Sequence, residues 1–257
     1  EKAVKVAEKY WPGPLTMIFQ KTEEVPYETT GGLDTVAVRM PSDEIARALI
    51  DAGGGYIAAP SANTSGRPSP TKAEHVEEDL SGKIEMILDG GAVDIGVEST
   101  ILDMTVTPPM ILRPGAITKE MLEACIGEVT VDKAVIKLNQ RPKAPGMKYR
   151  HYAPKAPVTV VRGDPAQTAA YIAQHIGEKT GVMCFDEYRD CFPGCVVECF
   201  GSENDLGTQA REVFDRLRAF DDTDVRQIWA QCPSDEGLGL AVANRIKKAA
   251  GFSVVEV

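Results

Sequence analysis

The sequence lacks the features of several large classes of protein. No apolar run approaches the roughly 18 residues that a membrane helix needs. No secretory signal pattern is recognisable in the printed residues. The motifs G-x4-G-K-[ST], G-x-S-x-G and H-E-x-x-H do not occur. The sequence therefore disfavours a membrane protein, a Walker-type nucleotidase, an α/β-hydrolase and a zinc metalloprotease.

Metal-site spacing is missing as well. The chain has six cysteines, and Cys191, Cys195 and Cys199 follow C-x3-C spacing. A zinc site usually combines C-x2-C pairs with a fourth ligand, and no histidine lies near this cluster in the sequence. A chain of 257 residues does not depend on disulfides for its core. We therefore expect reduced thiols, no protein metal site and a cytoplasmic location.

Charge is distributed unevenly around a net value of −10. Residues 1–135 carry 12 basic and 22 acidic residues, and residues 157–257 carry 10 and 16. Between them, residues 136–156 carry six basic residues and no acidic one. Acidic bodies bind nucleic acid poorly, so direct binding of nucleic acid, tRNA included, is not expected from the charge. A local segment of charge +6 suits a polyanionic small ligand such as a triphosphate.

Apolar periodicity predicts a mixed α/β body in the first half of the chain. Ser42 is the expected N-cap of one helix, and Thr71 with Glu74 forms the expected capping box of another. The predicted helices are 1–10, 43–52, 71–79 and 119–125, and the predicted strands are 15–20, 35–39, 56–59, 84–88, 99–103 and 111–112.

Residues 139–157 contain four prolines among basic and aromatic residues, and no periodicity survives there. Strand and helix patterns alternate after it, which predicts a small parallel α/β sheet. The predicted strands are 158–161, 181–185, 195–200 and 227–231, and the helices are 165–176, 206–220 and 238–250. The sequence thus predicts a catalytic domain over 1–138, a linker over 139–157 and a second domain over 158–257.

Four segments carry more polar residues than an ordinary core needs. Residues 58–71 offer hydroxyls and backbone N–H groups that could bind phosphate. Residues 96–103 place serine and threonine before a strand, and Arg113 stands between an apolar pair and a Pro-Gly turn. Residues 144–154 alternate cations with aromatic rings. A surface loop, a strand start, a salt bridge and a surface strap are the alternative interpretations.

Taken together, these segments resemble the Sua5/YrdC/YciO family, and in particular its two-domain Sua5 branch. The order and spacing agree from residue 1 to about 154, and the chain after that resembles the Sua5 C-terminal domain with a weaker signature. The matching pieces are Trp11-Pro12-Gly13-Pro14-Leu15-Thr16, Val36-Ala37-Val38-Arg39-Met40-Pro41, Ala59-Pro60-Ser61-Ala62-Asn63-Thr64-Ser65-Gly66, Gly96-Val97-Glu98-Ser99-Thr100, Leu112-Arg113-Pro114-Gly115 and Pro145-Gly146-Met147-Lys148-Tyr149-Arg150-His151-Tyr152-Ala153-Pro154.

The resemblance implies a fold and a reaction. The fold is a twisted mixed α/β YrdC-like domain, joined by a linker to a smaller Rossmann-like parallel α/β domain. The reaction is that of a nucleotidyltransferase, a threonylcarbamoyl-AMP synthase. L-threonine, bicarbonate and ATP give threonylcarbamoyl-AMP and pyrophosphate, the first step of the t6A modification of tRNA. A downstream tRNA threonylcarbamoyl transferase machinery would consume the product, and Mg2+ is expected to accompany ATP.

The resemblance also assigns residues to roles. Arg39 is expected to hold the threonine carboxylate, with Ala59 and Ser99 lining the same pocket. No covalent enzyme intermediate is needed, so catalysis is expected to come from positioning by Arg39, Ser61 and Asn63. The residues expected to contact ATP are Thr35, Ser61, Asn63, Ser69, Arg113, Tyr149 and Tyr152.

The sequence departs from the family pattern at its start. The family carries a Lys-x-Arg-Pro-type segment and a Thr-x-Tyr segment before the Trp-Pro-Gly-Pro motif, and this chain has neither. We therefore expect an N-terminally truncated chain that holds part of the site, and expect the activity in the full-length protein. Two alternative functions are an RNA-binding YrdC-like module and a regulator that binds nucleotide without turnover.

Overall fold

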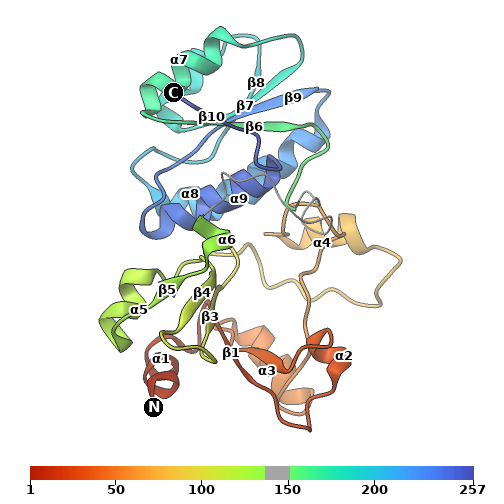
Figure 1. Cartoon of the computed structure of the whole chain (residues 1–257). Helices are drawn as coiled ribbons and strands as arrows, with labels where there is room; N and C mark the ends of the chain where they lie inside the picture. The colour runs from red at the N-terminus through yellow and green to blue at the C-terminus, as the bar shows by residue number, and fades with distance from the viewer. Residues whose placement is uncertain (137–150) are drawn as a thin grey trace. The chain divides into compact units, whose positions relative to one another are not determined.

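The computed structural model describes residues 1–136 and 151–257, which form two compact units (Figure 1). The first unit contains residues 1–60 and 98–136, and the second contains residues 61–97 with the described residues from 151 onwards. The contacts therefore group residues 61–97 with the C-terminal part of the chain. The linear domain boundaries at 138 and 157 remain a prediction, and most of the linker lies outside the described residues.

The first unit is built on a mixed five-stranded sheet with the order β2-β1-β3-β4-β5. The strand β1 pairs antiparallel with β2 and parallel with β3. Its strands are β1 (Leu15–Gln20), β2 (Thr35–Arg39), β3 (Thr100–Asp103), β4 (Met110–Arg113) and β5 (Thr130–Val131). Its helices are α1 (Lys2–Tyr10), α2 (Tyr27–Thr30), α3 (Glu44–Ala52), α5 (Lys119–Ile126) and α6 (Lys133–Ile136).

The core of the first unit lies between one face of this sheet and the helices α1 and α5. Val6 of α1 and Leu122 of α5 are fully buried and belong to one cluster with Leu15, Met17 and Leu102 of the sheet. Leu15 and Met17 are two residues apart in β1, so both project from the same face. The core therefore occupies one face of the sheet, and the other face carries the intervening residues.

The second unit contains a parallel five-stranded sheet with the order β10-β6-β9-β7-β8 (Figure 1). Strand–helix alternation gave the correct prediction of this sheet. Its strands are β6 (Val158–Arg162), β7 (Thr180–Cys184), β8 (Val196–Cys199), β9 (Gln227–Gln231) and β10 (Val254–Glu256). Its helices are α4 (Ala73–Leu80), α7 (Pro165–Gln174), α8 (Leu206–Ala219) and α9 (Gly237–Ala249), with 3-10 turns η2 (Asp186–Cys191) and η3 (Phe220–Asp222).

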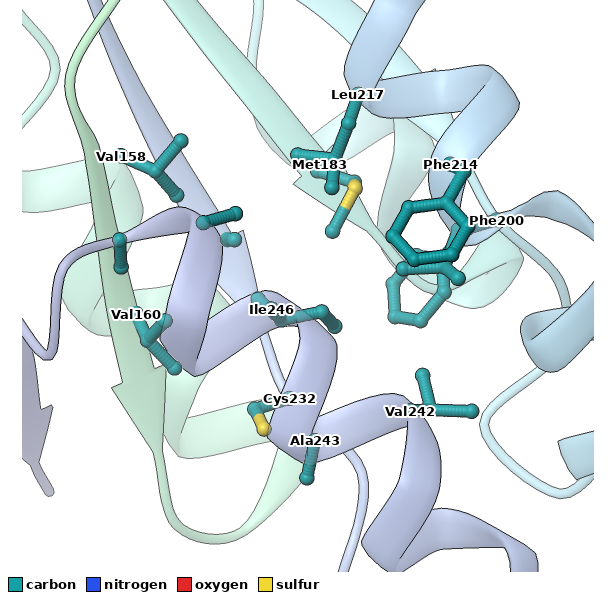
Figure 2. Close-up of a cluster of buried hydrophobic side chains, with 14 of the residues drawn as sticks. Val158, Val160, Met183, Phe200, Phe214, Leu217, Cys232, Val242, Ala243 and Ile246 are labelled. Carbon is teal, nitrogen blue, oxygen red and sulfur yellow. The ribbon is translucent and has the colours of Figure 1, made fainter. Parts of the chain in front are cut away.

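Helices cover both faces of this parallel sheet. Val160 packs with Phe214 of α8 and Ile246 of α9 in one core, which Figure 2 shows in close-up. The next residue, Val161, packs with Ile172 of α7 in a separate core. Successive residues of a strand project to opposite faces, so the valines of β6 contribute to both cores. This is the three-layer arrangement expected of a Rossmann-like domain.

Two of the predicted strands are wrong. Residues 56–59 and 84–88 form no strand, and Tyr56 and Met86 are 87% and 73% exposed. Both stretches are short apolar runs, and such a run becomes a strand only where a neighbouring strand takes up its backbone hydrogen bonds. The short elements α2, β5, α6 and β10 were not predicted.

The predicted helix caps also need correction. Asp43, not Ser42, caps α3, and its carboxylate accepts a hydrogen bond of 2.7 Å from the backbone N–H of Ala46. Helix α4 begins after Lys72, so Thr71 does not cap it. The backbone N–H of Thr71 instead donates to Nδ1 of His75 at 3.1 Å. No helix of the described residues is long and apolar enough to cross a membrane.

Candidate active site

Two arginines lie in one row across the sheet of the first unit. Thr16 of β1 pairs with Arg39 of β2 on one side and with Ile101 of β3 on the other. Ile101 in turn pairs with Arg113 of β4. Arg39 and Thr16 are directly opposite and project to the same face. The register shifts between Ile101 and Leu102, and hydrogen bonds to Ser99, whose hydroxyl touches that of Thr16, place the Arg113 side chain on this face as well. Neighbouring strands are about 4.8 Å apart, so roughly 14 Å separates the backbones of the two arginines. The sheet therefore presents two cations from one face at a fixed spacing.

This face is the more open face of the sheet. Arg39 is exposed, and Thr16 and Ile101 are half-buried. Their chain neighbours Leu15 and Leu102 have no exposed surface and belong to the core on the opposite face. Among residues 1–136 and 151–257, no carboxylate forms an ion pair with Arg39. A guanidinium in this setting can bind an anionic ligand without first breaking an ion pair.

Ser99 connects this row to the loop that precedes β3. Its hydroxyl lies 2.8 Å from the hydroxyl of Thr16. Arg113 donates from Nε to the backbone carbonyl of Ser99 at 3.0 Å and from Nη2 to its hydroxyl at 3.1 Å. Two donors of one planar guanidinium thus bind one residue, which fixes the plane of Arg113. The remaining donors of Arg113 stay in a defined direction.

The Trp-Pro-Gly-Pro turn holds two predicted site residues in place. The backbone N–H of Gly13 donates to the carbonyl of Met40, the residue after Arg39, at 2.9 Å. The carbonyl of Pro14 accepts from the N–H of Thr100, the residue after Ser99, at 3.0 Å. One turn therefore attaches the end of β2 and the start of β3. This gives a structural reason for a motif that the sequence linked to the family without a role.

The Arg-Pro-Gly turn after β4 also approaches the start of β3 closely. A Cβ atom on Gly115 would lie 2.5 Å from the backbone N of Thr100 and 2.6 Å from the carbonyl O of Glu98. Real Cβ atoms do not come so close to backbone atoms. Only glycine lets the turn pack against the backbone on both sides of Ser99.

The other predicted residues of the first unit lie at different distances from this row. Thr35 is half-buried and shares the face of Arg39, because four residues separate them in β2. They are at opposite ends of that strand, about 13 Å apart along it. Ala59 is exposed in the irregular segment 56–60. Ser99 and Arg113 therefore lie in one hydrogen-bond network with Thr16, and Arg39 joins it only through its strand pairing with Thr16.

Three predicted ATP contacts lie in the loop 61–71 of the second unit. Ser61 is exposed, and Ser69 is buried with 7% of its surface exposed. The Asn63 amide donates to the carbonyls of Thr64 at 3.0 Å and Arg67 at 3.3 Å, which closes a tight turn. Within the described residues, the buried Oδ1 of Asn63 accepts no hydrogen bond. The loop thus combines an internally bonded amide with hydroxyls at both ends.

Asp79, at the end of α4, holds this loop through two hydrogen bonds from Thr64. Its carboxylate accepts from the backbone N–H of Thr64 at 3.0 Å, and its carbonyl accepts from the Thr64 hydroxyl at 3.2 Å. Burial alone would raise the pKa of Asp79, but hydrogen bonds from Arg218 and Thr64 and the charges of Arg218 and Arg67 hold it below its usual value. Asp79 is therefore a buried anion that is fully paired.

The aromatic part of the linker is only partly described. Tyr149 lies outside the described residues. Tyr152 has a left-handed backbone, with φ 64°, and its ring centroid lies 5.1 Å from that of Phe214. The ring of Tyr152 is therefore half-buried against α8. Its contact with ATP stays a prediction.

No group of three or more histidine, cysteine, aspartate or glutamate side chains in the described part of the chain could hold a metal ion. Cys184 and Cys199 approach to 3.8 Å between their sulfurs, and burial raises the pKa of both thiols. All six cysteines are free.

Sequence reasoning assigned no role to Thr16, Asp79 or Arg218. Thr16 is the last residue of the Trp-Pro-Gly-Pro-Leu-Thr motif. The sequence signals that could have pointed to it are its place in a predicted strand and the polar residues Ser99 and Thr100 at the start of another. Asp79 and Arg218 looked like ordinary charges on amphipathic helices. Their burial, at 3% and 4% exposure, depends on contacts about 140 residues apart in the chain, and no local pattern reports such contacts.

Two protein-family models match consecutive parts of the chain. The model described as telomere recombination matches residues 1–115. The model described as threonylcarbamoyl-AMP synthase, C-terminal domain, matches residues 117–251. Together they cover both parts of the predicted architecture.

Curated relatives and solved structures match the chain from end to end. A threonylcarbamoyl-AMP synthase of Pyrococcus abyssi is 48% identical over 100% of this chain and 76% of its own length. One of Bacillus subtilis is 46% identical over 99% and 75%. The crystal structure of P. abyssi Sua5 complexed with L-threonine matches with a TM-score of 0.90 and 46% identity, covering 100% of this chain and 76% of that one. The chain belongs to the threonylcarbamoyl-AMP synthase family, in its two-domain Sua5 form.

Proposed function

We propose that this protein is a nucleotidyltransferase that makes threonylcarbamoyl-AMP and pyrophosphate from L-threonine, bicarbonate and ATP. The observation that carries the proposal is the row from Arg39 to Arg113 on the open face of a sheet that matches a threonine-bound relative. The reaction brings together a carboxylate and a polyphosphate. Two cations at a fixed spacing on one face suit these two anionic groups.

At the threonine end, Arg39 would hold the substrate carboxylate. It is exposed and makes no ion pair within the described chain, so a carboxylate can take a bidentate position on its guanidinium. Ser99, fixed between Thr16 and Arg113, would border the same pocket. Ala59 would line it with a small side chain. The amine of threonine would then attack the carbon of bicarbonate, so that a C–N bond forms, a C–O bond breaks and water leaves as the carbamate is made.

At the nucleotide end, Arg113 would contact ATP on one side of Ser99. The other residues that we propose to contact ATP are Thr35, Ser61, Asn63, Ser69 and the linker tyrosines Tyr149 and Tyr152. The carbamate oxygen attacks the α-phosphorus of ATP, a P–O bond forms, and pyrophosphate leaves with the electrons of the broken bond. A carbamate is a weak nucleophile, so the protein contributes mainly by alignment and by cationic groups near the developing charge.

We propose that Mg2+ enters with ATP. The described residues provide no cluster of ligands for a metal, and magnesium commonly keeps substrate phosphates and waters as most of its ligands. Its chemistry there would be to screen phosphate charge. The cytoplasm is the proposed compartment, in line with six free thiols. A tRNA threonylcarbamoyl transferase machinery is the proposed consumer of the product.

The direct test follows pyrophosphate and the adenylate product by mass spectrometry with purified protein. Product should require threonine, bicarbonate and ATP together, and omission of any one should abolish it. Arg39→Ala should lower product formation, while Arg47→Ala, at an exposed arginine of α3 in the same unit, should not. ATP binding without turnover would favour a nucleotide-binding regulator. Tight RNA binding with a steep salt dependence would favour an RNA-binding module.

A further inference from the structure

Buried charges of the second unit meet beneath the loop 61–71. Arg218 of α8 donates from Nη2 and Nη1 to the two carboxylate oxygens of Asp79, at 2.9 and 3.3 Å. Arg67, from the loop itself, pairs with Asp79 and lies 3.4 Å from Asp221. The side chains of Asp79 and Arg218 are 0% and 4% exposed. Glu78, whose side chain is half exposed, also pairs with Arg67 at 2.9 Å and with Arg218 at 3.4 Å. Two cations and three anions therefore share this cluster, and Asp79, Asp221 and Arg218 are its buried members.

This cluster fixes the backbone of the loop at two points. Asp79 accepts the N–H of Thr64 at 3.0 Å, and Arg218 donates to the carbonyl of Pro68 at 2.7 Å. The stretch between these points contains Gly66 in the left-handed region, at φ 94°. Asn63 and Ser69 flank the stretch on either side. A change at Arg218 would therefore release one end of the stretch directly and the other through Asp79.

The chain that leaves the basic linker joins the same cluster. The backbone N–H of Ala153 donates to the carbonyl of Gly66 at 2.9 Å. Lys155 donates from its backbone N–H to the Asp221 carboxylate at 2.7 Å and from Nζ to the Asp221 carbonyl at 3.0 Å. The loop, the end of the linker and α8 with its 3-10 extension are therefore connected through the backbone and the charges.

Stability alone is a poor explanation for such a cluster. Removing charges from water costs several kcal/mol per ion, and well-packed apolar residues often stabilise a core equally well. A planar guanidinium that binds two carboxylate oxygens and a carbonyl does fix direction, which an apolar contact does not. Geometry is thus the property that these residues supply.

We propose that Arg218 is a positioning residue for nucleotide binding, which acts through Asp79 and Pro68 to hold the loop between Asn63 and Ser69 in its binding conformation. The inference rests on the proposed function, in which this loop contacts ATP. It assigns the C-terminal part of the chain a role in the reaction although Arg218 itself is buried. We expect Arg218 to have no effect on threonine binding by Arg39, which lies in the other unit.

The test compares Arg218→Gln with Lys247→Gln. Lys247 is also buried, at 3% exposure, and pairs with Asp235 at 2.7 Å, but it contacts no residue of the loop in the described contacts. Both variants replace a buried cation with glutamine. We expect Arg218→Gln to raise the KM for ATP about tenfold, one step of 1.4 kcal/mol. The KM for threonine should change less than about twofold, and Lys247→Gln should alter neither constant.

Two further measurements separate positioning from loss of fold. Amide hydrogen exchange should speed up at Thr64 and its neighbours in Arg218→Gln and stay unchanged there in Lys247→Gln. Arg218→Lys keeps the positive charge but lacks the planar guanidinium that donates from two nitrogens, and it should give an intermediate KM for ATP. If Arg218→Gln does not fold, Arg218→Lys carries the same comparison. An unchanged KM for ATP in the folded variants would overturn the proposal, whereas a wild-type protein without ATP-dependent product would overturn the proposed function.

Discussion

Arg113 donates to both the carbonyl and the hydroxyl of Ser99, at 3.0 and 3.1 Å. The family resemblance assigned these two residues to different substrates, Arg113 to ATP and Ser99 to threonine. Their direct contact means that the two predicted binding sites share a hydrogen-bond network. A change at one of these residues should therefore affect the binding of both substrates.

Ser99→Ala tests this shared network. It removes the acceptor for Arg113 Nη2 and the partner of the Thr16 hydroxyl. We expect each affinity, for threonine and for ATP, to fall by about 1–2 kcal/mol, as when one partner of a charged hydrogen bond is lost. Calorimetric titration with each ligand measures both. If only the affinity for threonine falls, the contact between Ser99 and Arg113 does not influence ATP binding.

Arg39→Ala should act on threonine alone. Arg39 lies three strands away from Arg113 in the sheet order, with Thr16 and Ile101 between them. We expect threonine binding to weaken by about 1.5–3 kcal/mol, with ATP binding changed far less. Arg47→Ala is the matched control, since it removes an exposed arginine of the same unit. Equal losses for the two ligands would count against the assigned role.

Arg113→Lys should separate charge from geometry. Lysine keeps the positive charge but cannot bind the Ser99 carbonyl and hydroxyl with two donors of one plane. We expect the KM for ATP to rise about fivefold to tenfold with an unchanged melting temperature, since roughly 1 kcal/mol of positioned hydrogen bonding is lost. Steady-state kinetics and a thermal melt provide the two readings. An earlier melt with an unaltered KM would indicate that Arg113 serves the fold.

The sequence predicted the strands of the first unit better than their register. Residues 15–20 and 35–39 show a strand pattern between turn residues, and both form the predicted strands. Nothing in either segment states that Thr16 stands opposite Arg39. Thr16 and Ser99, whose hydroxyls touch, are 83 residues apart. Register depends on such distant partners, so the row of two arginines could only be read from the structure.

The charged cluster beneath the loop was beyond sequence reasoning for a related reason. Asp79 follows Glu77 and Glu78, so it resembles one more solvated acid at a helix end. It is buried because Arg67 and Arg218 neutralise it, and Arg218 lies 139 residues away. An amphipathic pattern records which face of a helix is apolar. It does not indicate that Arg218 on α8 has a buried carboxylate as its partner.

Acid should destabilise the second unit through its paired aspartates. The hydrogen bond from His75 lowers the pKa of Asp215 despite its burial, and Lys72 adds to the effect. The pKa of Asp79 is also held below its usual value. Such groups take up protons more readily in the unfolded chain, so their contribution is complete above a pH of about 4 and is lost as pH falls further.

Urea unfolding between pH 7 and pH 3 measures this loss. The free energy of unfolding should fall below pH 4 more steeply in the wild type than in Asp215→Asn, which has no carboxylate at that position. Asp224→Asn is a suitable control, because Lys179 lowers the pKa of Asp224 too, but this ion pair lies at the surface, where solvent screens it and its contribution to stability is small. Parallel curves for wild type and Asp215→Asn would show that Asp215 does not contribute to the acid transition.

Gly115→Ala should disturb the site through the backbone. The added Cβ would stand 2.5 Å from the Thr100 nitrogen, so either the turn or the start of β3 must shift. Ser99 and its bonds to Arg113 and Thr16 move with that backbone. We expect a loss of stability of about 1–3 kcal/mol from overpacking, with weaker binding of both substrates.

Gly127→Ala separates this steric effect from the general cost of replacing glycine. Gly127 has φ 78° and ψ −152°, a backbone region that essentially only glycine adopts, and an added Cβ there would meet no atom within 4 Å, so its replacement costs only backbone strain, about 1–3 kcal/mol. Thermal melts should show a loss in both variants, whereas substrate affinity should fall only in Gly115→Ala. Unchanged affinity in a folded Gly115→Ala protein would mean that the turn relaxes without moving Ser99. In that case the close approach at Gly115 would matter for packing and not for the geometry of the site.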